Sequence, residues 1–184
     1  MKKAITFLMA SAAMFTLSAE TIKLEFQNNN GFEQTTPKGL IKLWTYNPYS
    51  KTFKGGGTMT SIPNGYKGKA VKLKSQDGQR IYFYSAKAAK IKEGKDTVKV
   101  SLWCKGKGTL QISLYGYTAA NKNAGGWDGK KIAIDTPEWK QYTWSIPLKT
   151  RGKNITNIRI APGIFGATDL EIDEFEVVIE RQVD

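Results

Sequence analysis

Several stretches of this chain place aromatic and polar side chains on one side of a strand and aliphatic side chains on the other. In RIYFYS, residues 80–85, Ile81 and Phe83 alternate with Tyr82 and Tyr84. The same alternation runs through residues 97–118 and 157–161. Because side chains point to opposite faces along a strand, it predicts one aromatic–polar surface. That surface consists of Tyr82, Tyr84, Trp103, Gln111, Tyr115, Tyr117 and Arg159.

These residue types suit the chemistry of sugar recognition. Flat rings stack on the C–H faces of a pyranose, while amide and guanidinium groups hydrogen-bond its hydroxyls. Exposed aromatic patches are usually functional, so the pattern favours a ligand-binding sheet face. Two structural alternatives stay open: the rings pair across strands only to stabilise the sheet, or a loop covers them.

Two further tryptophans stand in stretches that are expected to be loops. Trp44 lies in LWTYNPYSKTF together with Tyr46 and Tyr49, and Trp127 lies in the glycine-rich AGGWDGKK. Binding residues concentrate on loops, so both tryptophans are candidate ligand contacts. Alternatively, each plugs one end of the fold.

The composition excludes several catalytic classes. The chain has no histidine and one cysteine, which removes Ser–His–Asp and Cys–His machinery and any disulfide within the chain. Cys104 alternates with aliphatic residues, which predicts a buried thiol. The acidic residues gather in the last strand, away from the aromatic surface. We therefore expect a non-catalytic protein, although a lyase that uses Tyr115 or Lys99 as a base stays open.

The elements that must position these residues are short strands separated by Gly, Asn, Asp and Pro clusters. This pattern predicts an all-β fold, a β-sandwich jelly roll of two antiparallel sheets. Residues 86–93 could form a helical turn or a loop, and residues 40–68 are expected to be mostly irregular. The predicted strands are Thr21–Gln27, Lys69–Ser75, Arg80–Ser85, Thr97–Lys105, Thr109–Thr118, Lys140–Leu148, Asn157–Ala161 and Leu170–Glu180.

The amino terminus predicts export. Residues 1–19 have two lysines, an apolar run and small residues at the end, as in a secretory signal, which leaves residues 20–184 as a single domain. Without Lys2 and Lys3 the net charge would fall from +12 to +10. That charge predicts an anionic partner, such as an acidic polysaccharide, or simply serves solubility. We expect a secreted or periplasmic monomer with no nucleic-acid partner and no membrane span.

Four motifs carry a resemblance that covers residues 21–181. NNNGFE, GYKGKAVKLKS, TPEWKQYTWSIPL and DLEIDEFEVVIE follow one another in this order. Together they resemble the β-jelly-roll carbohydrate-binding modules of the galactose-binding-domain-like superfamily, especially its glucan- and xylan-binding branch. In that family the tryptophan of the W-x-x-Y strand commonly packs at the end of the core. The resemblance therefore implies structural roles for Trp139, Tyr142 and Trp144.

The resemblance also implies a structural calcium ion. The matching positions are Glu33, the backbone oxygens of residues 67–69, represented by Lys69, and Asp173, and hard cations bind such oxygen ligands. This chain has NGFE where NGDFE or NGSFE is common, so Glu25 could replace Glu33. Alternatively, Asp173 only caps a strand bulge.

Three functions follow from these patterns. The leading one is a secreted bacterial protein that binds a polysaccharide or glycan without catalysis. The second is a structural or protein-interaction module of the envelope or cell surface. The third is a small lyase or hydrolase that acts on an acidic polysaccharide.

Overall fold

The computed structural model describes residues 19–23, 29, 31–47 and 57–182. Residues 1–18 of the expected secretory signal, as well as Glu25 and Tyr49, lie outside this part. The described residues form strands and no helix that could cross a bilayer. The strands are β1 (Ala19–Lys23), β2 (Trp44–Asn47), β3 (Thr58–Ile62), β4 (Ala70–Ser75), β5 (Arg80–Ser85), β6 (Ala89–Lys90), β7 (Asp96–Thr118), β8 (Asn123–Asp128), β9 (Ile132–Pro147) and β10 (Ile155–Gln182).

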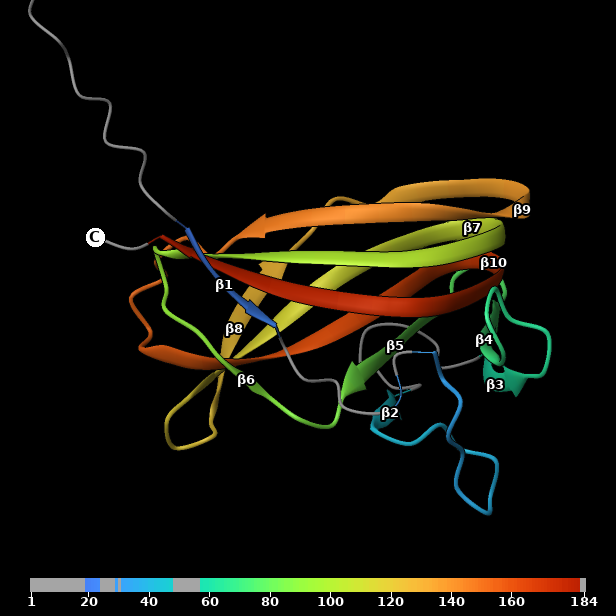
Figure 1. Ribbon diagram of the computed structural model, residues 1–184, viewed down its shortest axis with the longest axis horizontal. Helices are drawn as coiled ribbons and strands as arrows, with labels where there is room; N and C mark the ends of the chain where they lie inside the picture. The colour runs from blue at the N-terminus through green and yellow to red at the C-terminus, as the bar shows by residue number, and fades with distance from the viewer. Residues whose placement is uncertain (1–18, 24–28, 30, 48–56, 183–184) are drawn as a thin grey trace, which may run out of the picture.

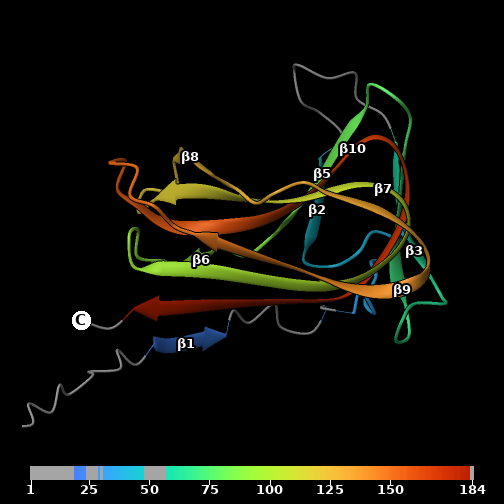
Figure 2. The ribbon, with the colours of Figure 1, turned by 90° about the horizontal axis from the view of Figure 1, so that it is seen from above.

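Three long strands pass through both layers of a β-sandwich. β7, β9 and β10 run side by side (Figure 1), and they curl at one end of the molecule (Figure 2). The first layer contains β2, β5, residues 155–165 of β10, residues 109–118 of β7, residues 132–133 of β9, and β8. The second layer contains β1, β3, β4, residues 168–182 of β10, residues 96–105 of β7, and residues 140–147 of β9. The predicted β-sandwich is confirmed.

The strand boundaries differ from the prediction where the long strands bend. Residues 97–105 and 109–118, expected as two strands, belong to the single strand β7, and residues 157–161 and 170–180 belong to the single strand β10. The ladders shift register where these strands bend, and in β7 a glycine allows the turn. Gly106 has φ +111°, and a Cβ there would lie 2.2 Å from the carbonyl oxygen of Asp169. A side chain at this position would therefore be strained and would clash.

Other strands arise where loops were expected. β2 and β3 fall inside the segment expected to be irregular, and β8 occupies the glycine-rich AGGWD stretch. Residues 86–93 hold no helical turn but contain the short strand β6, which pairs with β10. Ladder pairing with neighbouring strands thus overrides weak local preference.

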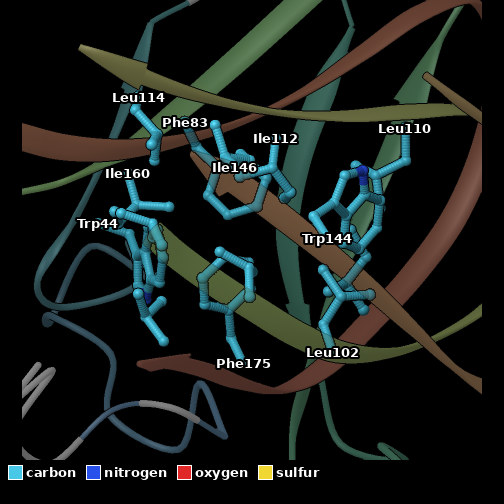
Figure 3. Close-up of a cluster of buried hydrophobic side chains, with 14 of the residues drawn as sticks. Trp44, Phe83, Leu102, Leu110, Ile112, Leu114, Trp144, Ile146, Ile160 and Phe175 are labelled. Atoms are coloured by element: carbon cyan, nitrogen blue, oxygen red, sulfur yellow. The ribbon is translucent and has the colours of Figure 1, made fainter. Parts of the chain in front are cut away.

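The aliphatic sides of the two layers face one another and form the core. Leu110, Ile112 and Leu114 of the first layer and Val98, Val100 and Leu102 of the second are all buried. Figure 3 shows members of this core together with Trp44, Phe83, Trp144 and Phe175. The parity assigned to these strands is confirmed, and Cys104 is buried as predicted. Burial raises the pKa of the Cys104 thiol.

Candidate functional site

The outer side of the first layer carries a continuous set of aromatic and cationic side chains, here called the tyrosine–arginine face. Cross-strand pairing brings its members together: Tyr82 lies opposite Gly163, Gly163 opposite Gln111, and Arg159 opposite Tyr115. The face consists of Arg80, Tyr82, Tyr84, Gln111, Tyr115, Tyr117, Arg159 and Phe165. Its tyrosines and arginines are half-buried, so rings and guanidinium groups remain within reach of a ligand.

The rings at one end of this face surround a guanidinium group. The Tyr82 and Tyr115 centroids are 6.1 Å apart at 60°, and those of Tyr82 and Phe165 are 6.0 Å apart at 86°. The Arg80 guanidinium lies 4.1 Å from the Tyr82 centroid and 4.4 Å from that of Phe165. Lys131 Nζ approaches Phe165 to 4.2 Å. Such cation–π contacts orient both partners.

Small residues form the floor between the rings. Ala161 and Ser113 lie opposite one another on this side of the sheet, and both are buried by the larger side chains around them. A Cβ on Gly163 would lie 2.4 Å from the Tyr82 ring, so the ring rests directly on the backbone of β10. The floor therefore fixes the distance of the Tyr82 ring from the backbone of the sheet.

Positive charge dominates the face. The Arg159 guanidinium lies 5.3 Å from the Tyr117 centroid and 6.0 Å from that of Tyr84. Its Nε is buried and has no hydrogen-bond partner among the described residues. Burial raises the pKa of Tyr115, and burial lowers the pKa of Arg80. The rest of the Arg159 guanidinium is half-buried, so its outer N–H groups can donate to a ligand that supplies an acceptor.

One carboxylate does lie on this side of the sheet, against the sequence-based expectation. Asp128 pairs with Ser113 in the β7–β8 ladder and accepts a hydrogen bond of 2.6 Å from its hydroxyl. Gln111 Nε2 donates to the carbonyl oxygen of Gly129 at 2.8 Å, which holds the amide in place. Sequence parity puts Tyr115 and Lys99, the two candidate bases, on one face, but Lys99 lies in the second layer and Tyr115 in the first, so this shared face is wrong.

Trp103 does not belong to the tyrosine–arginine face. It lies on residues 96–105 of β7, on the outer side of the second layer, because β7 bends between Trp103 and Tyr115. Its ring stacks on Tyr66, with centroids 3.9 Å apart and planes 8° apart. Trp139 meets Tyr66 edge-on at 6.3 Å. The expected packing of Trp139 at the end of the core is therefore wrong.

The candidate tryptophans Trp44 and Trp127 are core residues, and their expected loop positions are wrong. Trp44 starts β2, is 7% exposed and makes edge contacts with Phe83 and Phe175. Trp127 lies opposite the inward Leu114 in β8, and its indole nitrogen donates to the carbonyl oxygen of Lys149 at 2.9 Å. Both rings are already packed and offer no stacking face to a ligand. Trp144 is buried, and the partly buried Tyr142 packs against the core, as the structural roles require.

The residues implied as calcium ligands do converge. Asp173 is fully buried and accepts hydrogen bonds from the backbone amides of Lys67 (2.8 Å) and Glu174 (2.7 Å). Glu33 accepts one from the amide of Lys69 at 2.8 Å. Burial, followed by the charges of Glu174 and Glu33, raises the pKa of Asp173 to about 6 despite the two amide hydrogen bonds.

The position of Gly31 shows how closely the carboxylates approach one another, and so how well they fit a hard cation. A Cβ on Gly31 would lie 3.1 Å from Glu174 Oε1, 3.6 Å from Glu33 Oε1 and 3.7 Å from Asp173 Oδ1. The three residues Glu33, Asp173 and Glu174 are here called the carboxylate cluster. No three acidic side chains of the described ranges stand at metal-ligand spacing. Asp173 also sits at the β10 bulge, as its alternative role as a bulge cap requires.

Four members of these sites were missed by the sequence analysis. Arg80 and Phe165 continue the outward parity of Tyr82 and Arg159, so extending that parity along β5 and β10 would have included them. Glu174 adopts φ +46° at the bulge, where parity changes. Tyr66 lies in the loop between β3 and β4, and no periodic pattern in the sequence indicates its position.

No family model and no curated protein matches this sequence. Solved structures share the fold. A cyclase from Fischerella sp. TAU has a TM-score of 0.64 at 10% identity, over 91% of this chain and 100% of that chain. The Clostridium thermocellum xylanase 10B, a CBM22-1–GH10 structure complexed with xylohexaose, has a TM-score of 0.53 at 16% identity, over 85% of this chain. An arabinose-bound α-L-arabinofuranosidase has a TM-score of 0.56 at 17% identity, over 83%.

The chain spans 27% of the xylanase chain and 26% of the arabinofuranosidase chain. At these identities the likeness concerns the fold, which is the β-sandwich expected from the four motifs. Sandwiches of this kind host unrelated functions. The side chains of this chain, and not its fold, therefore decide what it binds.

Proposed function

We propose that this chain binds a carbohydrate on the tyrosine–arginine face without transforming it. The observation that carries the proposal is the arrangement of Tyr82, Tyr115 and Phe165 around a floor of Gly163 and Ala161. Because the Arg80 guanidinium lies over the Tyr82 and Phe165 rings, sugar C–H groups would meet the edges of these rings and the Tyr115 ring, with polar groups at their margin. The structural likeness to a xylanase with a carbohydrate-binding module supports the proposal at the level of fold.

The sugar class proposed here is acidic. Three cations lie on the face or at its edge, namely Arg80, Arg159 and Lys131, whereas one carboxylate, Asp128, is described on this side of the sheet. The half-buried Arg159 guanidinium favours a carboxylate or sulfate acceptor, because charge-assisted hydrogen bonds are the stronger ones. The net charge of +12 favours the same class of ligand through long-range attraction.

A structural calcium ion at the carboxylate cluster is part of this proposal. Asp173 and the carbonyl oxygen of Lys69 would supply the first ligands, and the carboxylates of Glu33 and Glu174, which do not stand at metal-ligand spacing with Asp173, would have to turn toward the ion. Asp173 Oδ2 and that carbonyl lie 2.6 Å and 2.7 Å from the same point, a Cβ placed on Gly65. When bound, the ion would neutralise buried negative charge, and the carboxylates would hold the loop between β3 and β4 against β10 through the amides of Lys67 and Lys69.

Export across a bacterial inner membrane is also proposed, on the charge and apolar pattern of residues 1–19. The protein would then meet polysaccharide outside the cytoplasm. Expression of the full chain in a bacterial host, followed by amino-terminal sequencing of the periplasmic fraction, tests this. A processed chain that begins near Glu20 is the expected result, and an unprocessed cytoplasmic chain would reject export.

Calorimetric titration against polysaccharides of stated charge tests the binding function. Polygalacturonate and alginate represent the acidic class, and xylan and β-1,4-galactan the neutral class. We expect Tyr82→Ala and Tyr115→Ala each to weaken binding of the acidic polymers by about 3- to 10-fold, since an aromatic contact contributes about 0.5–1.5 kcal/mol. Thr143→Ala, an exposed change in the second layer, should leave it unchanged.

Arginine variants test the sugar class. Arg159→Gln should weaken binding to polygalacturonate and reduce its dependence on salt, whereas Arg151→Gln, which removes the same charge outside the face, should do neither. Binding of neutral xylan alone would reject the acidic class. No binding to any of the four polymers, or binding unaffected by Tyr82→Ala and Tyr115→Ala, would reject the tyrosine–arginine face as a carbohydrate site.

A further inference from the structure

The outer side of the second layer carries a second group of accessible aromatic rings, the tryptophan cluster of Tyr66, Trp103 and Trp139. Trp103 and Tyr66 are stacked face to face, and Tyr66 is still 46% exposed. Trp103 and Trp139 are half-buried. The other tryptophans, Trp44, Trp127 and Trp144, lie in the core. Both tryptophans with accessible surface are therefore on the layer opposite to the tyrosine–arginine face.

The stacked pair is held in place from below. Trp103 pairs with Asp173 across the β7–β10 ladder, and Asp173 accepts the amide of Lys67, the residue after Tyr66. A second amide, that of Lys69, is bound by Glu33, and Gly65 N donates to the carbonyl oxygen of Gly68 at 2.7 Å. The backbone that presents the Tyr66 ring is thus fixed on both sides, which lowers the entropic cost of binding.

A polar hollow of about 430 Å³ adjoins the cluster. Lys105, which lines it, places its ammonium group 4.9 Å from the Trp139 centroid. A second hollow of about 670 Å³ shares Lys107 and Asp169 with the first. Both volumes fall within the range of about 300–1,000 Å³ that is usual for ligand sites. The rings and hollows together offer room for more than one ring of a linear ligand.

The charges around the hollow are balanced. Lys72, Lys105 and Lys107 line it with Asp135, Asp169 and Glu171, and ion pairs join them. Lys105 Nζ lies 3.1 Å from Glu171, Lys72 Nζ 3.1 Å from Glu171, and Lys107 Nζ 3.4 Å from Asp135. A polyanion would gain little from lysines that are already paired and would face three carboxylates. This surface therefore fits a neutral ligand that is rich in hydroxyl groups.

We propose that the tryptophan cluster and the adjoining hollow form a second carbohydrate site, which takes a neutral glycan. The Tyr66 ring, backed by Trp103, supplies the stacking surface, and the ion-paired lysines and carboxylates supply donors and acceptors for hydroxyl groups. A protein-interaction site usually shows a larger contiguous patch of exposed apolar side chains. Apart from Tyr66, the one large hydrophobic side chain that the described ranges leave exposed is Leu40.

The proposal goes beyond binding on the first layer and has a consequence of its own. Because the two sites lie on opposite layers, one molecule can hold two glycan chains at once, one acidic and one neutral. Linking two polymers in this way raises the local concentration of each for the next molecule.

Indole N–H resonances in a nitrogen-15 spectrum distinguish the two sites, since the tyrosine–arginine face contains no tryptophan. The probes are xylohexaose and cellohexaose as neutral glycans and trigalacturonate as the acidic one. On the Tyr82→Ala, Tyr115→Ala double variant, which impairs the first site, we expect a neutral hexasaccharide to shift the Trp103 and Trp139 resonances. The Trp44, Trp127 and Trp144 resonances should stay in place. Trp103→Phe and Trp139→Phe assign the signals.

Tyr66→Ala should weaken the affinity for the neutral hexasaccharide, measured from the indole shifts, about tenfold. The variant should stay folded, because Tyr66 lies in an exposed loop. Thr143→Ala is the matched control on the same layer. Absence of any shift at Trp103 and Trp139 with both hexasaccharides would overturn the second site, even where polygalacturonate still binds the first. A shift that persists unchanged in Tyr66→Ala would also overturn it. Absence of trigalacturonate and polygalacturonate binding by the parent protein, with the indole shifts intact, would reject only the first site.

Discussion

Asp173 and Trp103 lie opposite one another in the β10–β7 ladder, and the loop that Asp173 binds places Tyr66 on the Trp103 ring. A buried carboxylate and an exposed aromatic pair are therefore parts of one local structure. Any change in the ionisation or coordination of Asp173 acts on the loop through the amide of Lys67. This relationship links the proposed calcium site to the tryptophan cluster.

The pKa of Asp173 predicts an unusual dependence of stability on pH. The folded-state pKa of about 6 exceeds the value of about 3.9 in an unfolded chain. Between these values the folded state binds more protons, so the free energy of unfolding falls as pH rises from about 4 to about 6, by up to about 3 kcal/mol. Urea denaturation at several pH values, without calcium, measures the slope. Asp173→Asn should flatten it.

Calcium should restore the stability that the protein loses when Asp173 ionises. At pH 7 an ion that binds the ionised cluster stabilises the folded state by mass action, so millimolar calcium should raise Tm in the parent. Asp173→Asn and Glu33→Gln should respond less, and magnesium, which prefers a strict octahedral shell, should act more weakly. A Tm that is indifferent to calcium at pH 7 would reject the proposed ion.

Gly163→Ala should weaken carbohydrate binding on the first layer without unfolding it. The backbone of Gly163 tolerates a side chain, but the new Cβ would lie 2.4 Å from the Tyr82 ring, which must move. We expect affinity for polygalacturonate to fall about fivefold, within the range of one aromatic contact. In a Tyr82→Ala background the same change should add no further loss. An additive effect would show that Gly163 acts through something other than Tyr82.

Trp44 should affect stability and not binding. Its ring packs between Phe83 and Phe175 in the core, so Trp44→Ala should cost about 4 kcal/mol in urea denaturation, and Trp44→Phe should cost less and keep the protein folded. The folded Trp44→Phe variant should bind polygalacturonate like the parent. A selective loss of affinity in this variant would restore Trp44 as a ligand contact.

Removal of the Asp96 carboxylate should lower the free energy of unfolding more than removal of the Glu180 carboxylate. Asp96 is 2% exposed, accepts hydrogen bonds of 2.9 Å and 3.0 Å from Arg181, and accepts the amide of Lys92 at 2.7 Å. Asp96→Ala leaves a largely covered guanidinium unpaired, which should cost about 3 kcal/mol. Glu180→Ala, which breaks the more exposed pair with Lys99, should cost less than about 1 kcal/mol. Equal losses in urea denaturation would contradict the buried role of Asp96.

By itself the sequence determined which side of each strand is buried. Period-two alternation assigns Val98, Val100 and Leu102 to the core and Tyr82, Tyr84 and Tyr115 to the outside, and the structure agrees. Alternation is a local property, because neighbouring side chains must point to opposite faces of the sheet. The all-β class follows from the same pattern, and the motif order led to the carboxylates around Gly31.

Only the tertiary structure decided which outward residues share a surface. Parity cannot tell which of two sheets an outward residue lies on, and β7 crosses from one layer to the other at Gly106. Trp103 and Tyr115 therefore have the same parity but lie on opposite sides of the molecule. Trp44 and Trp127 became core residues because ladders with β5 and β7 turned expected loops into strands. Tyr66 joined Trp103 through a hydrogen bond between residues 106 positions apart, a contact that no local pattern encodes.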